Sequence, residues 1–240
     1  MPRGRFLQDA ARTFEVHVIG GNEAGSPRSL RRSKPVQVPR VSLNPFRDTP
    51  GGRGDYTPRV TTAATIGRAC LLALLAWWTA QFVPHPLDAD LIGNSFLHLI
   101  NLPFHEAGHI VFSPLGEFMT VLGGSLFQVI IPVVCAVAFI RREDWFAMTV
   151  CVWWAGENLI DLGPYIADAR ALQLPLLGGQ TGAEVTGHDW EAILETLGWL
   201  RFDHTLGMAA HITGSVVMIA ALAAGVWCLR SQWSPEQTEA

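Results

Sequence analysis

The chain has 240 residues, of which 49% are hydrophobic and only 16% charged, with a formal net charge of −4. Soluble domains average about 25% charged residues, so this composition argues against an ordinary soluble globular protein. The slightly negative net charge gives no sign of a nucleic-acid partner, and none is expected.

The first 60 residues differ from the rest of the chain. They are rich in Arg, Pro, Gly and Ser and hold more basic than acidic residues. Their apolar content is too low for a packed core, so we predict a disordered basic cytoplasmic tail over residues 1–60. No N-terminal signal peptide is visible, because the first long apolar run begins only near Ala63.

Four apolar stretches follow that are long enough, or nearly so, to cross a bilayer. They cover residues 63–83, 120–140, 145–162 and 206–229. We predict an all-α, polytopic membrane bundle of about four to five membrane segments over residues 61–230, followed by a short C-terminal tail at 231–240. Such a chain is an integral membrane protein in contact with lipid. We expect it in the plasma (inner) membrane, with its N terminus in the cytoplasm.

A further segment, residues 91–112, carries the motif His105-Glu106-Ala107-Gly108-His109. It either spans the bilayer or enters it part way, since polar groups at depth need protein or water around them. Basic loops favour the cytoplasm. If the segment re-enters, the tail, Arg141-Arg142 and Arg230 all fall on one side. If it spans, Arg141-Arg142 falls outside, so the charges favour a partial or tilted helix.

On a helix the two histidines of this HExxH motif share one face, where both imidazoles reach one Zn²⁺. Glu106 lies beside them and can take a proton from zinc-activated water and pass it to a leaving amine. A pair of core histidines is the alternative, but these polar groups are hard to satisfy on an apolar helix without a metal. The motif therefore predicts a zinc centre with Glu106 as catalytic base.

A catalytic zinc site usually has a third protein ligand. The candidates are Glu157, Asp161, Asp168 and His188, which has Asp189 beside it. Glu157 and Asp161 lie four residues apart near the end of a membrane segment and share a helical face. Asp161 could instead orient a zinc-bound histidine, and Asp168 could cap a helix or pair with a nearby arginine. His188 and Asp189 could also be an exposed helix start.

The order of these motifs resembles that of the site-2-protease-like M50 metallopeptidases. HEAGH in a membrane segment is followed by a Gly-rich entry to the next segment, Gly123-Gly124-Ser125, and by an Asp at the end of a later one. In that family HExxH gives two zinc ligands and the general base, and a later Asp gives the third ligand. The resemblance implies His105 and His109 as ligands and Glu106 as base. Ala167-Asp168-Ala169 is similar to the Ser-Asp-Ala-type element of divergent M50B-like members, which implies Asp168 as third ligand, with Asp161 second.

Together these patterns predict a membrane-embedded zinc endopeptidase that hydrolyses peptide bonds of membrane-associated proteins or peptides. Water must reach such a site, so we expect a polar cavity under residues 163–203, the sizeable polar segment after the tail. Two other functions stay open. One is a zinc-binding membrane protein without peptidase activity, a partner or chaperone of membrane segments, with His188 as fourth ligand. The other is a zinc hydrolase of lipid or small amides.

Overall fold

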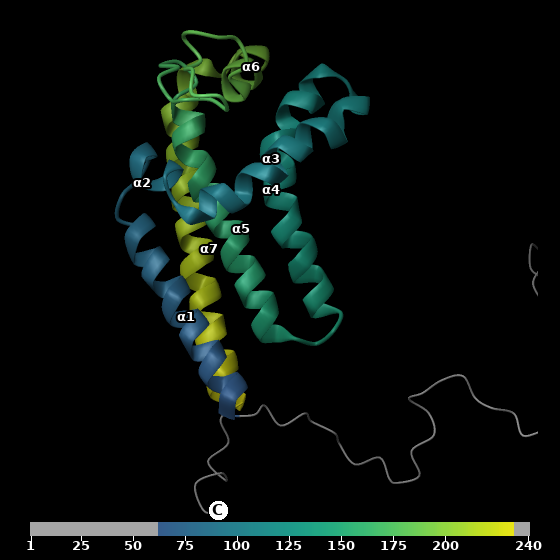
Figure 1. The fold of residues 1–240 in the computed structure, drawn as a ribbon, viewed down its shortest axis with the longest axis vertical. Helices are drawn as coiled ribbons and strands as arrows, with labels where there is room; N and C mark the ends of the chain where they lie inside the picture. Colours follow the sequence, from purple (N-terminus) through teal and green to yellow (C-terminus); the bar gives the residue numbers. More distant parts are fainter. Residues whose placement is uncertain (1–61, 233–240) are drawn as a thin grey trace, which may run out of the picture. The chain divides into compact units, whose positions relative to one another are not determined.

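The computed structural model describes residues 62–232, so the predictions for the two tails lie largely or wholly outside the described residues. The regular structure of this part is all-helical, which confirms the all-α part of the predicted fold class (Figure 1). The long helices are α1 (Thr62–Phe82), α3 (Phe96–Phe112), α4 (Glu117–Ile140), α5 (Trp145–Ala167) and α7 (Asp203–Gln232). The short elements are α2 (Ala89–Gly93), α6 (Asp189–Thr196) and the 3₁₀ helices η1 (Ser113–Leu115) and η2 (Leu200–Phe202).

Three helical stretches of the described part are long and apolar enough to cross a membrane, which suits a membrane protein. They are α1, α4 and Leu200–Ser231, which contains most of α7. The helix α5 has 23 residues but is not among them. Its buried Glu157, Asn158 and Asp161 lower its mean hydropathy, so length and composition support three of the four to five expected segments.

The apolar core lies where α1, α5 and α7 meet. Its buried members include Leu75 and Phe82 from α1, Ile160 from α5 and Met218 from α7. Close packing of such side chains is the main source of stability within a bundle of this kind once its apolar faces are aligned.

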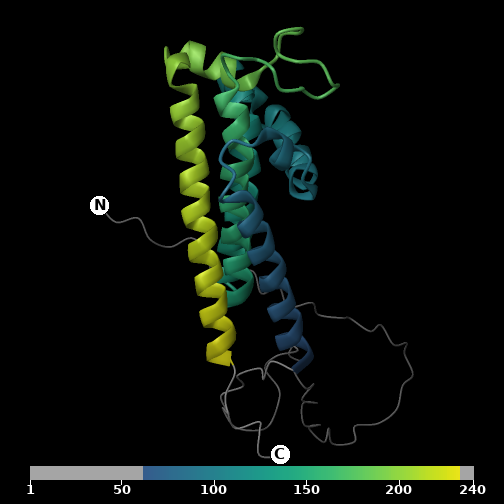
Figure 2. The same cartoon turned by 90° about the vertical axis from the view of Figure 1, so that its left-hand side faces the viewer.

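Two pairs of glycines bring α5 and α7 together, and Figure 2 shows α7 running beside α5. A Cβ added at Gly156 would lie 2.9 Å from the carbonyl oxygen of Gly214. A Cβ added at Gly207 would lie 2.6 Å from the carbonyl oxygen of Gly163. In each helix the two glycines are seven residues apart and so share one face. These small residues therefore set the close approach of the two helices.

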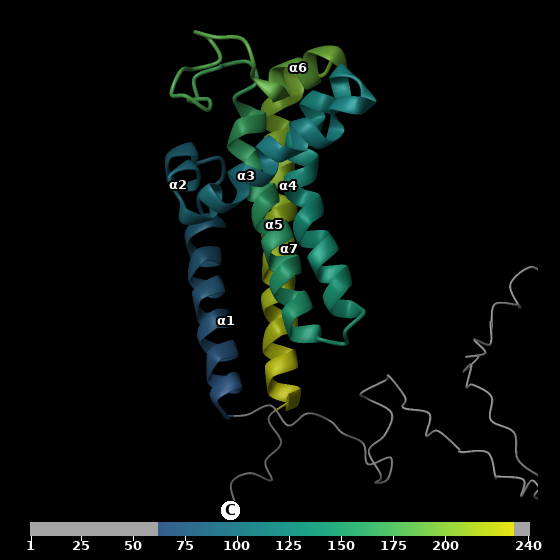
Figure 3. The ribbon, with the colours of Figure 1, turned by 45° about the vertical axis from the view of Figure 1, so that its right-hand side comes forward.

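The start of α1, the turn between α4 and α5, and the end of α7 lie at one end of the described part. Leu72, Phe146 and Cys228, one from each of α1, α5 and α7, form a buried cluster there. From the far end of α1, α2 and α3 continue away from this cluster (Figure 3). Arg141-Arg142 and Arg230 consequently lie at the end where α1 begins, the arrangement that the charge pattern favoured.

The glycine of the HEAGH motif lets α3 approach α4. A Cβ added at Gly123 would lie 2.7 Å from the carbonyl oxygen of Gly108, and a Cβ at Gly108 would meet the backbone of Gly123 in turn. The helix α3 begins after Ser95, whose side chain accepts a hydrogen bond from the His98 backbone N–H. This crossing places the histidine face of α3 against α4.

Candidate metal centre

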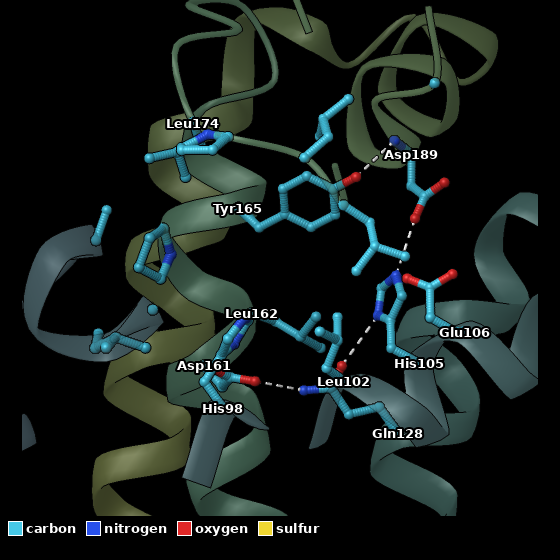
Figure 4. Close-up of a pocket in the computed structure, with 18 of the residues that line it drawn as sticks. His98, Leu102, His105, Glu106, Gln128, Asp161, Leu162, Tyr165, Leu174 and Asp189 are labelled. Atoms are coloured by element: carbon cyan, nitrogen blue, oxygen red, sulfur yellow. Dashed lines mark hydrogen bonds and ion pairs between the residues drawn. The ribbon is translucent and has the colours of Figure 1, made fainter. Parts of the chain in front are cut away.

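The side chain of Asp189 meets the two histidines of α3, His105 and His109. His105, His109 and Asp189 each offer a ligand atom, and these atoms all lie within 4.8 Å of one another. Asp189 Oδ2 is 3.0 Å from His105 Nε2 and 3.3 Å from His109 Nε2. Ligands at about 2.0–2.1 Å from a tetrahedral zinc ion are about 3.3 Å apart, so these separations suit a single ion. Figure 4 shows Asp189 facing His105, with Glu106 beside the ring.

The other nitrogen of each imidazole faces an oxygen. His105 Nδ1 is 3.0 Å from the side-chain oxygen of Gln128, and His109 Nδ1 is 2.9 Å from the backbone oxygen of Thr120. An amide oxygen only accepts, so each Nδ1 carries the hydrogen and donates it. In the neutral ring each Nε2 then turns a lone pair toward the Asp189 carboxylate. These acceptors are compatible only with a positive charge between them, either a proton on Nε2 or a metal ion, and a metal ion fits the donor set.

The helix α4 leaves room for that cation at Gly124. An added Cβ would lie 2.6 Å from Nε2 of both His105 and His109. A methyl group there would occupy the place where the two lone pairs converge. The absence of a side chain at Gly124 therefore lets both Nε2 atoms lie close to α4 and to each other.

The three ligand residues and Glu106 line one cavity of about 680 Å³. Its walls come from α2, α3, the end of α5 and the segment 174–187. Its apolar lining includes Leu102, Leu162, Leu174, Leu176 and Val185. This is the cavity expected under the polar segment. It combines carboxylates with an apolar surface, as small-molecule and peptide sites commonly do.

Asp189 owes its position to the start of α6. The His188 side chain caps this helix, because its Nδ1 accepts the Glu191 backbone N–H at 3.1 Å. Burial lowers the pKa of His188, which keeps the ring in the neutral form that this cap requires. The Asp189 backbone N–H donates to the Tyr165 hydroxyl at 3.0 Å, and the rings of Tyr165 and His188 have centroids 4.4 Å apart. Contacts on both sides thus hold Asp189 over α3.

The structure places Asp189, and not Asp168, beside the two histidines. Both oxygens of Asp168 are already used: Oδ1 accepts the Gln173 N–H at 3.0 Å and Oδ2 the Leu174 N–H at 2.9 Å. Asp168 Oδ2 also lies 3.5 Å from His188 Nε2. Asp168, the predicted third ligand, therefore binds the backbone of the segment that follows α5. His188, the fourth ligand expected for a structural site, contacts Asp168.

The two other candidates also lie outside the group. Asp161 Oδ2 accepts from the side-chain nitrogen of Gln128 at 2.8 Å, and Gln128 in turn contacts His105. Glu157 accepts from Asn101 at 2.9 Å. Sequence reasoning did not predict that Asp189 would lie beside the two histidines or that Gln128 would contact His105. The one available signal was the polar cluster His188-Asp189 at a helix start.

Comparison with known proteins identifies no relative of this chain. No protein-family model, no curated protein and no solved structure matches it. Its function is therefore inferred from the geometry of its own site.

Proposed function

We propose that this chain is a membrane-embedded, zinc-dependent endopeptidase in which His105, His109 and Asp189 hold the metal and Glu106 is the general base. One observation carries the proposal: the group has three protein ligands among the described residues, and it opens on a cavity. Structural zinc sites use four protein ligands, whereas catalytic sites use three and keep a fourth position open. This favours a catalytic centre over a structural one.

The residues of the site divide the work. Zinc, when bound, supplies the Lewis acidity that activates water and polarises a carbonyl group. Glu106 accepts the proton of the attacking water and passes it to the departing amine nitrogen. Thr120 and Gln128 hold the two imidazoles in the ligating form. The apolar side chains of the cavity, Leu102 and Leu162 among them, contact the substrate and exclude further water.

The surroundings of α3 support a membrane-associated substrate. Its outer face carries Phe96, Leu99 and Ile110, which are 63%, 62% and 76% exposed. His105, on the opposite face of the same helix, is only 8% exposed. An apolar surface of this kind suits lipid chains, so the site lies one helix away from a surface fit for the bilayer. Peptide segments held in or at the membrane are the substrates closest to such a site.

The charges support an orientation. Arg141-Arg142 and Arg230 lie at the end where α1 begins, and basic segments stay in the cytoplasm. The site lies towards the other end, beneath α6 (Figure 3). We therefore place the N terminus in the cytoplasm of a plasma (inner) membrane, with the cavity opening towards the opposite side.

Glu106→Gln tests the assigned role in the purified full-length chain, in detergent with zinc, with a synthetic apolar membrane-spanning peptide as substrate. Zinc binding should stay at the wild-type level while cleavage falls by about 100-fold or more, because the base is lost and the ligands are kept. The matched control is Glu117→Gln at the exposed start of α4, which should cleave at the wild-type rate. Full activity of Glu106→Gln would contradict the role. Zinc binding by the wild type without any cleavage of the peptide would contradict the peptidase function.

A further inference from the structure

A row of buried polar side chains leads away from His105 through three helices. Gln128 of α4 receives the His105 Nδ1 hydrogen at 3.0 Å and donates to Asp161 Oδ2 of α5 at 2.8 Å. Asp161 Oδ1 lies 2.8 Å from His98 Nδ1, back on α3 (Figure 4). Gln128 is 2% exposed and Asp161 8%. The two hydrogen bonds of Gln128 are buried and are therefore worth more than surface ones, whereas that of His98 is only partly buried.

The direction of each hydrogen bond in this row is fixed. Asp161 Oδ2 also accepts from the Asn101 nitrogen, so the amide nitrogen of Gln128 faces the same oxygen as a second donor. The oxygen of the same amide then faces His105 and can only accept from it. Asp161 thereby decides, through Gln128, which ring nitrogen of His105 carries the hydrogen.

Asp161 is itself held by a neighbour of fixed orientation. The Trp154 indole only donates, and it donates to the Asn101 side-chain oxygen at 2.9 Å. The amide nitrogen of Asn101 is therefore turned towards the acids, 3.2 Å from Asp161 Oδ2 and 2.9 Å from Glu157 Oε2. Asp161 consequently has hydrogen-bond donors on both sides and remains an acceptor for Gln128.

We propose that Gln128 and Asp161 are positioning residues for the metal ligand His105. Together they keep the hydrogen on Nδ1 and direct the Nε2 lone pair at the metal. His109 needs no such pair, because the backbone oxygen of Thr120 does the same for it. The proposal rests on the proposed metal site but not on peptidase activity. Partners of this kind typically change metal affinity by about 10–100-fold.

The first test removes the acceptor. Gln128→Leu should bind zinc about 10–100-fold more weakly than the wild type, measured in the full-length chain by competition with a chelating dye. Gln81→Leu in α1 is the control and should leave the affinity unchanged, because Gln81 neither lines the cavity nor belongs to the metal group. Helix content and thermal unfolding by circular dichroism verify that both variants fold.

The second test reverses the polarity with nearly isosteric residues, at pH 8, far above the ordinary carboxyl pKa of about 4. Gln128→Glu alone sets a carboxylate against Asp161 and should weaken zinc binding about 10-fold or more. Adding Asp161→Asn supplies an amide nitrogen for the new carboxylate and an oxygen for His98. The double variant should bind zinc more tightly than Gln128→Glu alone, because the new carboxylate again has a donor beside it, but less tightly than the wild type, because the new amide nitrogen faces the Asn101 nitrogen. If Gln128 and Asp161 only stabilised the core, the two substitutions would each weaken zinc binding, and the double variant would bind zinc more weakly than Gln128→Glu.

The outcomes separate the two proposals. Wild-type affinity in Gln128→Leu or Gln128→Glu, or a double variant no tighter than Gln128→Glu, would overturn the positioning role and leave the metal site standing. Absence of zinc binding by the wild type would overturn the metal site itself, and this role with it.

Discussion

Replacing Gly124 by alanine tests the metal centre most directly. The new methyl carbon would lie 2.6 Å from Nε2 of His105 and of His109, well inside the 3.4–4 Å of ordinary contact. An ion held by both nitrogens would sit about 2.0–2.1 Å from each, in the same small space. Overpacking a tight site costs about 1–3 kcal/mol. If the cost falls on the metal-bound form, zinc affinity drops by about 5- to 150-fold.

The assay is zinc affinity by dye competition, together with thermal unfolding of the same samples in detergent. Gly67→Ala in α1 is the neutral control, because a Cβ there meets nothing within 4 Å. Gly123→Ala is the packing control, since its Cβ meets the Gly108 backbone oxygen and not the histidine nitrogens. We expect Gly123→Ala to lower the unfolding temperature and Gly124→Ala to lower the zinc affinity. Wild-type affinity in Gly124→Ala would refute the position assigned to the ion.

Three further predictions concern the ligand set and the helix contacts. Asp189→Asn should weaken zinc binding by more than about 100-fold, which exceeds the effect of a residue that only contacts a ligand. Asp168→Asn should weaken zinc binding much less. Equal losses of zinc affinity in dye competition would contradict the ligand assignment. Gly214→Ala should destabilise the chain by about 1–3 kcal/mol through the contact with α5, and an unchanged unfolding midpoint would argue against that contact. Arg170→Ala removes two 2.7 Å hydrogen bonds from Asp203, which is 1% exposed, and should lower the unfolding midpoint, whereas Arg201→Ala should leave it nearly unchanged.

Local patterns were enough to predict the parts of this protein that depend on local geometry. Apolar runs predict long helices because a helix buries or exposes a face with a fixed period. The spacing of His105 and His109 places both rings on one face for the same reason. In the structure α3 is a helix that carries His105 and His109. Gly108 of the same motif allows α3 to cross close to α4.

The third ligand position could not be predicted in this way. Asp189 approaches the histidines only because α5, the segment after it and α6 fold back over α3. Asp168 matched a short element at the end of α5, and it does lie there, but the backbone that follows uses both of its oxygens. Gln128 is likewise brought to His105 by packing of α4 on α3, which a spacing rule does not encode. Contacts between distant segments depend on the whole fold.

The distance along the chain between the ligands has a consequence for biosynthesis. His109 leaves the ribosome 80 residues before Asp189. At about 5–20 residues per second, the growing chain holds two ligands without the third for about 4–16 seconds. During this interval the base Glu106 is already made, but the centre lacks its carboxylate ligand. In the proposed function, the centre is therefore completed only after most of the helices have been synthesised.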